Sequence, residues 1–295
     1  MPKPRQILNR RNAIGSIRDV TRTMQMVATA RFKRIHGQAV AARPYTDRLA
    51  QLVGDLVARG ALENCKHPLL AWPEHAAGEV MLVITSDRGL CGGYNNQVLH
   101  LAMERMGRVL AEGYQMKLHV VGRRGQQYLR FRNFEVDRAM ESFGPQPSFQ
   151  QVTALTDEMM DAFLAERISG LEVAYMQFVS AGSQKPAIAQ ILPLSALEQF
   201  RPSTPLAGTP APYEFHPSTG EILEELLPAT VRLRMYQCFL DAAVSEQVIR
   251  IRSMKAATDN AEEMIRNLTR RYNRTRQSQI TTELAEIIGG RSGIE

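Results

Sequence analysis

The chain has 295 residues, of which 36 are Lys or Arg and 30 are Asp or Glu, so its formal charge is +6 and its pI about 9.4. With 44% hydrophobic and 22% charged residues it can build one large or two ordinary domains, which excludes disorder over most of its length. Its three cysteines do not make a disulfide framework, and no apolar run is long enough to span a membrane. Disulfide-rich secreted proteins, collagens and integral membrane proteins are therefore excluded.

The positive charge is concentrated at the two ends of the chain. Residues 1–48 carry eleven basic and two acidic side chains, a local charge of +9. Residues 250–276 carry eight basic and three acidic side chains, a local charge of +5, so the remaining residues must sum to −8. Basic segments at both ends indicate that the two ends share a binding partner.

The first part of the chain, residues 1–60, has the spacing of a long helix, because apolar residues recur in steps of three and four. Pro44 is expected to kink or end this helix, with a second stretch running to about residue 59. The apolar stripe is narrow and the opposite face is basic, so we expect one helical partner rather than burial in a core. The stripe comprises Ile14, Ile17, Val20, Met24, Val27, Phe32 and Ile35.

The middle of the chain, residues 77–195, alternates between strand and helix patterns. Residues 80–84 form a continuous apolar run, which is typical of a strand buried on both faces. Further strands are predicted at 117–122, 171–180 and 186–194, the last two as a hairpin, and helices at 95–111, 126–131 and 149–168. This order predicts an α/β sandwich with a mostly parallel sheet. A proline-rich loop at 196–218 follows it.

The last segment, residues 219–290, predicts a second long helix, which opens with Ser218 and Glu221 at capping-box spacing and which Pro228 is expected to kink or restart. Its apolar seam predicts an antiparallel coiled coil with the first helix. Beyond the seam, an apolar tip needs another partner, and it comprises Ile280, Leu284, Ile287 and Ile288. The seam comprises Ile222, Leu226, Ala229, Leu233, Tyr236, Leu240, Ala243, Gln247, Ile251, Met254, Thr258, Ala261, Ile265, Leu268, Tyr272 and Thr275.

A glycine-bearing turn, residues 86–95, joins the first strand to the next helix. Such turns often bind phosphate, yet the chain lacks the glycine fingerprints of nucleotide sites, and glycines needed only for a tight turn explain the pattern as well. Cys91 beside Arg88 is either an activated thiolate or, more simply, a small buried side chain.

Two other kinds of site have weaker support. Cys65, His67 and His75 lie close in sequence, but together they offer too few ligands for a closed metal site. The basic ends could bind nucleic acid, although no basic segment is interleaved with the aromatic residues that would stack on bases.

Three segments resemble the gamma subunit family of F-type ATP synthases, in the family's order and over nearly the whole chain. Residues 20–28 resemble its first-helix signature, residues 84–95 match its central motif, and residues 245–284 carry several pieces of its C-terminal signature. Four positions depart from the family pattern, which favours a divergent or second-copy form: Asn12, Arg252, and Thr23 and Thr29 in place of frequent alanines.

The resemblance implies a role without chemistry or cofactors of its own. The helical pair would be the central shaft of a proton- or sodium-translocating rotary machine. One copy would stand inside a ring of alternating alpha and beta subunits, at the cytoplasmic face of a bacterial plasma membrane. The resemblance implies contacts with that ring at Met24, Arg276, Gln277, Thr281, Glu283 and Ile287. It also implies that the epsilon subunit and the membrane c-ring lie on the side of Arg88, Gly89, Leu90, Cys91, Gly92, Gly93, Tyr94 and Asn95.

Two alternatives remain on the residues alone. The first is a nucleotide-binding α/β enzyme that uses the turn from Gly89 to Gly93. The second is a basic coiled-coil protein that binds nucleic acid.

Overall fold

The computed structural model describes residues 4–58, 67–73, 78–141, 143–144, 146–194 and 219–292. The chain divides into two compact units, residues 1–29 with 250–295 and residues 30–249. The proline-rich loop predicted at 196–218 lies outside the described residues, as do Cys65 and His75. The division differs from the predicted domains, since parts of both long helices belong to the same unit as the sheet. The helices and strands are α1 (Pro4–Ala58), η1 (Pro68–Leu70), β1 (Glu79–Ile84), α2 (Tyr94–Ala111), β2 (Met116–Val121), α3 (Arg123–Phe131), β3 (Arg138–Met140), α4 (Phe149–Leu164), β4 (Gly170–Ser180), β5 (Ser183–Leu192) and α5 (Thr219–Ser292).

The larger unit is built on a five-stranded sheet of order β3-β2-β1-β4-β5. The first four strands in this order are parallel, and β5 pairs antiparallel with β4 in a hairpin whose ends meet at Ser180 and Ser183. The mostly parallel sheet predicted from the sequence is confirmed. The short edge strand β3 was not predicted, because three residues are too few for a periodic pattern.

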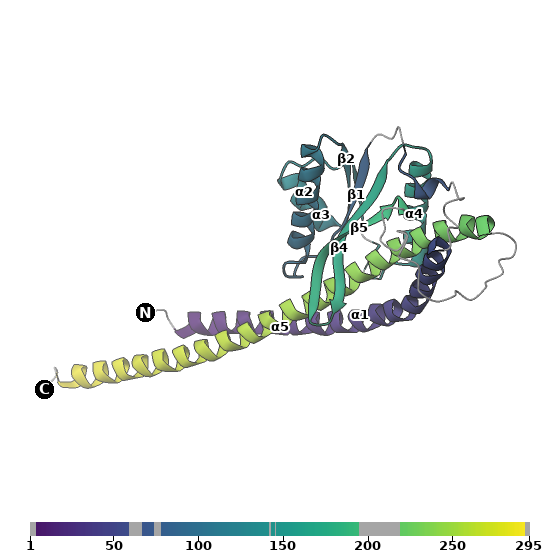
Figure 1. Ribbon diagram of the computed structural model, residues 1–295. Coiled ribbons are helices and arrows are strands. Elements are labelled where there is room, and N and C mark those ends of the chain that lie inside the picture. The colour runs from purple at the N-terminus through teal and green to yellow at the C-terminus, as the bar shows by residue number, and fades with distance from the viewer. Residues whose placement is uncertain are drawn as a thin grey trace. The chain divides into compact units, whose positions relative to one another are not determined.

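Helices cover both faces of this sheet (Figure 1). On one face, α2 and α3 pack against Met81, Val83 and Leu118. On the other face, α4 and the first half of α5 pack against Val80, Leu82 and other strand residues. Because β1 is central and covered on both sides, Val80 to Ile84 are all buried, as their continuous apolar run predicts.

The two long helices are more continuous than the sequence predicts. Helix α1 runs through Pro44 and helix α5 through Pro228, so neither proline ends its helix. Helix α5 also runs past residue 290, where the predicted segment ends, and stops at Ser292.

The seam predicted for the first part of α5 lies beside the most deeply buried face of the helix and not on it. Ile222, Leu226, Ala229 and Leu233 are only partly buried, whereas Leu223, Leu227, Val231 and Met235 are fully buried. These four buried residues belong to the core shared with the sheet and α4. A heptad count assumes a single helical partner, and in this part of α5 the sheet is the larger apolar surface.

Candidate functional site

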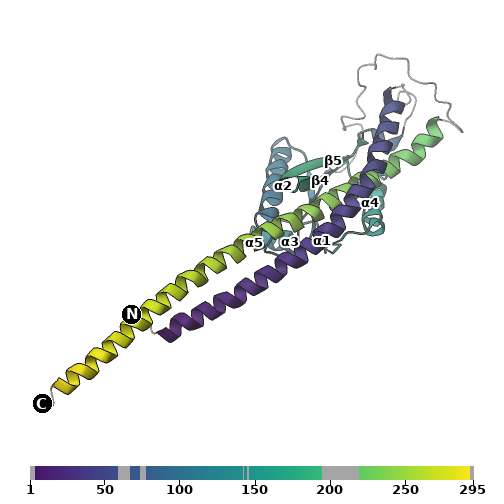
Figure 2. The same ribbon diagram turned by 90° about the horizontal axis from the view of Figure 1, so that it is seen from below.

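The smaller unit is a helical pair, residues 4–29 of α1 with residues 250–292 of α5 (Figure 2). Its seam on α5 is the predicted one, since Met254, Thr258 and Ala261 are buried. On α1 the buried residues include Thr21 and Ala28, seven positions apart. A seven-residue repeat is the spacing that keeps one face of a helix against its partner, so this unit has coiled-coil packing.

Most of the apolar stripe predicted for α1 lies on the surface in this unit, although Ile14 is half-buried. Ile17 and Val20 are each 55% exposed, Val27 is 45% exposed and Met24 is 38% exposed. The buried face of α1 in this unit instead combines an isoleucine with a threonine and an alanine, which a count of large apolar side chains does not find: Ile7, Thr21 and Ala28. The helical pair therefore presents an apolar face to its surroundings and needs something else to cover it.

Helix α5 continues beyond the end of its partner helix. Thr258 lies opposite Thr21, to which it is hydrogen-bonded, and Pro4 is 17 residues before Thr21. In an antiparallel pair, Pro4 then lies near Thr275, and α5 continues to Ser292 as a single helix. Figure 2 shows this part of α5 extending past the start of α1. We call residues 276–292 of α5 the overhang.

The overhang carries five of the six contact residues inferred from the family resemblance. From Arg276 to Ala285 every side chain is exposed, which includes Gln277, Thr281 and Glu283. The apolar side chains Ile280 and Leu284 are 44% and 53% exposed. Ile287 is helical, but its side chain lies outside the described ones. The part of the overhang with described side chains, Arg276 to Ala285, gains nothing from packing within this chain, so a binding partner would stabilise it.

Basic side chains dominate the surface of the helical pair. On α5 the exposed ones include Lys255, Arg266, Arg270, Arg271 and Arg274. An ion pair joins Arg18 and Asp19 on α1, with 2.8 Å between Arg18 Nη2 and Asp19 Oδ1. Asn12 and Arg252, which depart from the family pattern, are both exposed and so do not disturb the seam.

The turn after β1 is held together mainly by its own side chains. Ser86 N donates to Asn95 Oδ1 at 2.9 Å, and Asn95 Nδ2 lies 3.3 Å from Cys91 Sγ. Cys91 and Tyr94 are 1% exposed, so these two residues are structural here. Of the two interpretations of Cys91, an activated thiolate or a small buried side chain, its burial favours the second.

The outer part of the same turn is open to a partner. Leu90 has a φ of 65° and is 59% exposed, and Arg88, Gly92 and Gly93 are also exposed. A cavity of about 340 Å³ lies beside it, lined partly by Arg124, Tyr128 and Phe131 of α3.

Close packing fixes the position of α3 next to this turn. Thr85 Oγ1 donates to the Val121 carbonyl at 2.7 Å and accepts a hydrogen bond from Gly125 N at 3.0 Å. A Cβ added to Gly125 would lie 2.5 Å from Thr85 Oγ1, so only glycine allows this approach.

His67 has a structural role. Its Nδ1 accepts a hydrogen bond from Leu69 N at 3.2 Å and thereby caps η1, and burial lowers its pKa. Within the described residues, no group of three or more His, Cys, Asp and Glu side chains is placed to hold a metal ion.

No helix in the described part of the chain is long and apolar enough to cross a membrane.

Comparison with known proteins identifies the family. The model of a protein family described as ATP synthase matches residues 3–294. The chain is 39% identical to the ATP synthase gamma chain of Rhodopirellula baltica over 297 residues, which cover 100% of both chains. This chain belongs to the ATP synthase gamma chain family. A second gamma chain, from Frankia casuarinae, is 36% identical over 98% of this chain and 97% of its own length.

Two solved structures share the fold of this chain over most of its length. One is a chain of the Euglena gracilis mitochondrial ATP synthase, in a structure described as OSCP/F1/c-ring, with a TM-score of 0.67 and 19% identity, covering 99% of this chain and 94% of the other. Another belongs to the central stalk and c-ring of the Tetrahymena thermophila enzyme, with a TM-score of 0.57 and 18% identity, covering 81% of this chain and 99% of the other. The sequence resemblance to the gamma family is thus confirmed, and so is the fold class.

Proposed function

We propose that this chain is the central rotor shaft of a proton- or sodium-translocating F-type ATP synthase and performs no chemistry itself. The observation that carries the proposal is the overhang, a single helix that presents apolar side chains such as Ile280 and Leu284 and whose described side chains are all exposed. Membership of the gamma family and the likeness to central-stalk structures support it. This reading is favoured over a nucleotide enzyme and over a nucleic-acid-binding coiled coil.

The shaft would act by binding each of its neighbours differently. The overhang is a single helix with an apolar side at Ile280 and Leu284 and charged residues such as Arg276 around it, so it has no rotational symmetry. Inside a ring of alternating alpha and beta subunits it would present a different surface to each beta subunit. A rod that contacts one conformation better than another shifts the population of that subunit, and rotation would move this preference from site to site.

The proposed contacts with the ring are Met24 on α1 and Arg276, Gln277, Thr281, Glu283 and Ile287 on α5. The described members of this set are exposed, as a contact with another chain requires. The net positive charge of both ends fits acidic loops on the ring.

The proposed contact on the side of the epsilon subunit and c-ring is the turn from Arg88 to Asn95. Within this turn, Leu90, Gly92 and Gly93 are exposed and can contact another subunit. Cys91 and Tyr94 are buried in the turn itself, so their side chains cannot. As one copy in such a complex, the chain would be a peripheral membrane protein at the cytoplasmic face of a bacterial plasma membrane.

Reconstitution tests this proposal. The purified chain is mixed with the alpha and beta subunits of the same organism, and the products are examined by native mass spectrometry and by an ATP hydrolysis assay. We expect a complex with one copy of this chain and several copies of each partner, and ATP turnover that depends on this chain. Failure to join an ATP-hydrolysing complex would overturn the proposal.

A further inference from the structure

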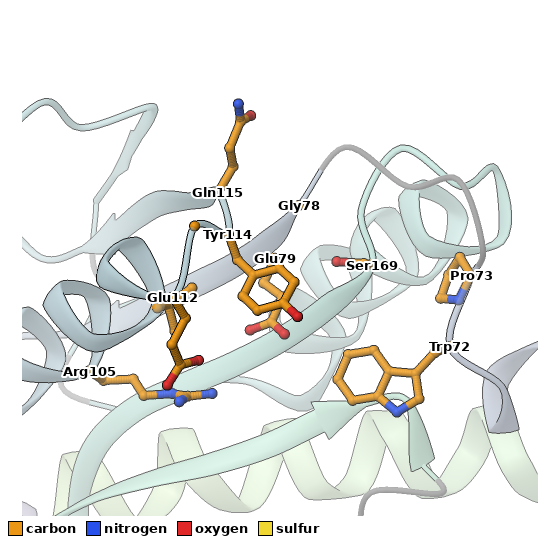
Figure 3. A pocket seen from close by; sticks show the side chains of 11 residues that line it. Trp72, Pro73, Gly78, Glu79, Arg105, Glu112, Tyr114, Gln115 and Ser169 are labelled. Atoms are coloured by element: carbon orange, nitrogen blue, oxygen red, sulfur yellow. The ribbon is translucent and has the colours of Figure 1, made fainter.

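A second cavity, of about 750 Å³, opens at the amino-terminal edge of the sheet, where β1, β2 and β4 begin (Figure 3). It is at the opposite ends of the strands from the turn that carries the family motif. The sequence carries no local signal for it, because its lining comes from separate parts of the chain. Its side chains include Trp72, Glu79, Arg105, Glu112 and Tyr114. We call it the acidic cavity.

The carboxylates of the acidic cavity outnumber its positive charges. Arg105 forms an ion pair with Glu172, with 3.0 Å between its Nε and Glu172 Oε2 and 2.6 Å between its Nη2 and Glu172 Oε1. Glu172 has a side chain only 5% exposed, so this pair is a fixed part of the fold. Glu79 and Glu112 then contribute negative charge that the described residues do not neutralise with an ion pair.

Glu79 has an oxygen without a partner. Its Oε2 is buried and accepts no hydrogen bond from any described residue. Burial is the main cause that raises the pKa of Glu79, nearby Glu172 raises it further, and Arg105 lowers it. A buried carboxylate oxygen without a donor destabilises the folded chain, so a positively charged donor from outside would be bound favourably here.

Two aromatic side chains line the same cavity as this carboxylate, and Figure 3 shows all three. The indole of Trp72 is 50% exposed and lies against Gly170, where an added Cβ would be 3.4 Å from its Cζ3. Tyr114 is 67% exposed and lines the cavity together with Glu79. Trp72 is thus positioned by the sheet edge, and both rings leave much of their surface in solvent.

We propose that the acidic cavity binds the guanidinium group of an arginine side chain presented by a neighbouring protein chain. Glu79 and Glu112 supply the negative charge, and Trp72 and Tyr114 supply faces on which a planar cation can stack. The inference is independent of the rotor proposal, because it depends only on residues within the larger unit of this chain.

The lining favours this occupant over other cations. A divalent metal would need at least three placed ligands, and the described residues offer no such group. Arginine is favoured over lysine because a guanidinium is planar, can donate to a carboxylate with two N–H groups and stacks on aromatic rings, whereas an ammonium is a compact and strongly hydrated charge.

Fluorescence can test the cavity directly, because Trp72 is the single tryptophan of the chain. The full chain is titrated with n-butylguanidinium, and the emission of Trp72 is recorded. We expect saturable binding with a Kd of about 1–10 mM, the range for so small a ligand. The neutral isostere n-butylurea, tested at the same concentrations, measures any effect that does not depend on charge.

Three variants assign the binding to this cavity. Glu79→Gln and Tyr114→Leu should each weaken binding by about fivefold or more, since each removes one of the two kinds of contact. Glu104→Gln is the matched control, because Glu104 is an exposed carboxylate of α2 that does not line the cavity, and it should change the Kd less than twofold. Equal binding of the urea, or equal Kd values for all variants, would overturn the proposal.

A crosslinking experiment tests the source of the guanidinium. A photoreactive phenylalanine derivative replaces the exposed Tyr114 in the reconstituted complex, and the crosslinked peptide is identified by mass spectrometry. A partner peptide with an arginine within a few residues of the crosslink supports the proposal. A peptide without one, or no crosslink in an active complex, would show that the cavity does not bind a protein side chain. If no complex forms, the rotor proposal fails while the fluorescence result still decides the cavity.

Discussion

Thr21 Oγ1 and Thr258 Oγ1 lie 2.8 Å apart in the seam of the helical pair, although 237 residues separate them in sequence. Each hydroxyl is also 2.9 Å from a carbonyl of its own helix, Arg18 O for Thr21 and Met254 O for Thr258. Since a hydroxyl has one proton, one threonine must donate to the other. A polar pair in an otherwise apolar seam fixes the register of two helices at some cost in stability.

Replacing both threonines by valine should therefore cost little. Thr21→Val or Thr258→Val alone should lower the free energy of unfolding by about 1 kcal/mol, because one hydrogen bond is lost in a buried seam. The double variant should be no less stable than either single variant, since no unpaired hydroxyl remains. Urea unfolding of the four proteins, monitored by helical circular dichroism, measures this coupling. Additive losses in the double variant would show that the two hydroxyls do not interact.

The Arg105–Glu172 pair should be strongly asymmetric to mutation. Arg105→Met leaves a nearly buried carboxylate without its partner and should destabilise the chain by about 3 kcal/mol. Glu172→Met should cost less, because Arg105 keeps Glu79 and Glu112 nearby and is 31% exposed in its side chain. Combining both substitutions should recover most of the loss from Arg105→Met. Chemical unfolding measures all three variants, and a double variant with the summed loss would contradict this account.

Glu79 should make the chain less stable as the pH rises. Its pKa in the folded chain is raised above 4.5, so the folded state holds the proton to a higher pH than the unfolded state does. The free energy of unfolding therefore falls as the pH rises from about 4.5 to the raised pKa of Glu79. Above that pKa it falls no further on account of Glu79. Glu79→Gln removes this loss, so its Tm should exceed that of the parent chain at pH 7.5.

The difference in Tm between these two chains should shrink as the pH falls below 4.5. Calorimetry at several pH values checks it, with Glu104→Gln as a control for the loss of an exposed negative charge. A Tm difference that stays constant with pH would mean that the Glu79 carboxylate is no more costly when folded than when unfolded.

Substitutions in the overhang should affect the assembled enzyme and spare the fold. Arg276→Ala and Gln277→Leu should lower ATP turnover by the reconstituted complex by about fivefold, which corresponds to losing roughly 1 kcal/mol of contact energy. The unfolding free energy of the isolated chain should change by no more than about 0.5 kcal/mol, because both side chains are exposed.

Arg167→Ala is a suitable control for these overhang variants, because it removes one exposed positive charge from the larger unit. It should leave ATP turnover unchanged. Should the overhang variants lose stability as much as they lose turnover, Arg276 and Gln277 would be packing residues rather than contacts.

Local sequence patterns predicted the fold well where a strand or helix has only one set of neighbours to pack against. The apolar run Val80–Ile84 is a central strand, and Met254 and Ala261 lie in the seam. The same reasoning was wrong for Ile17 and Val20 because a helix with two apolar surfaces has two candidate stripes, and periodicity does not say which one its intramolecular partner covers.

The candidate contacts could be predicted only through the family resemblance. Nothing in the spacing of Arg276 and Gln277 distinguishes them from other polar residues of a long helix, and their exposure becomes evident only when α5 is seen to continue past α1. The acidic cavity could not be predicted at all. Trp72, Glu79 and Tyr114 are brought together by the ends of neighbouring strands, which no local pattern encodes.

The overhang also has a mechanical consequence. Two packed helices resist bending and twisting together, whereas a single helix resists with its own backbone hydrogen bonds alone. Residues 276–292 span about 26 Å at 1.5 Å per residue. When a torque acts on the helical pair, bending and twisting should therefore be larger in residues 276–292 than in the paired part of the two helices. This last stretch of α5 would then be the more compliant part of the shaft.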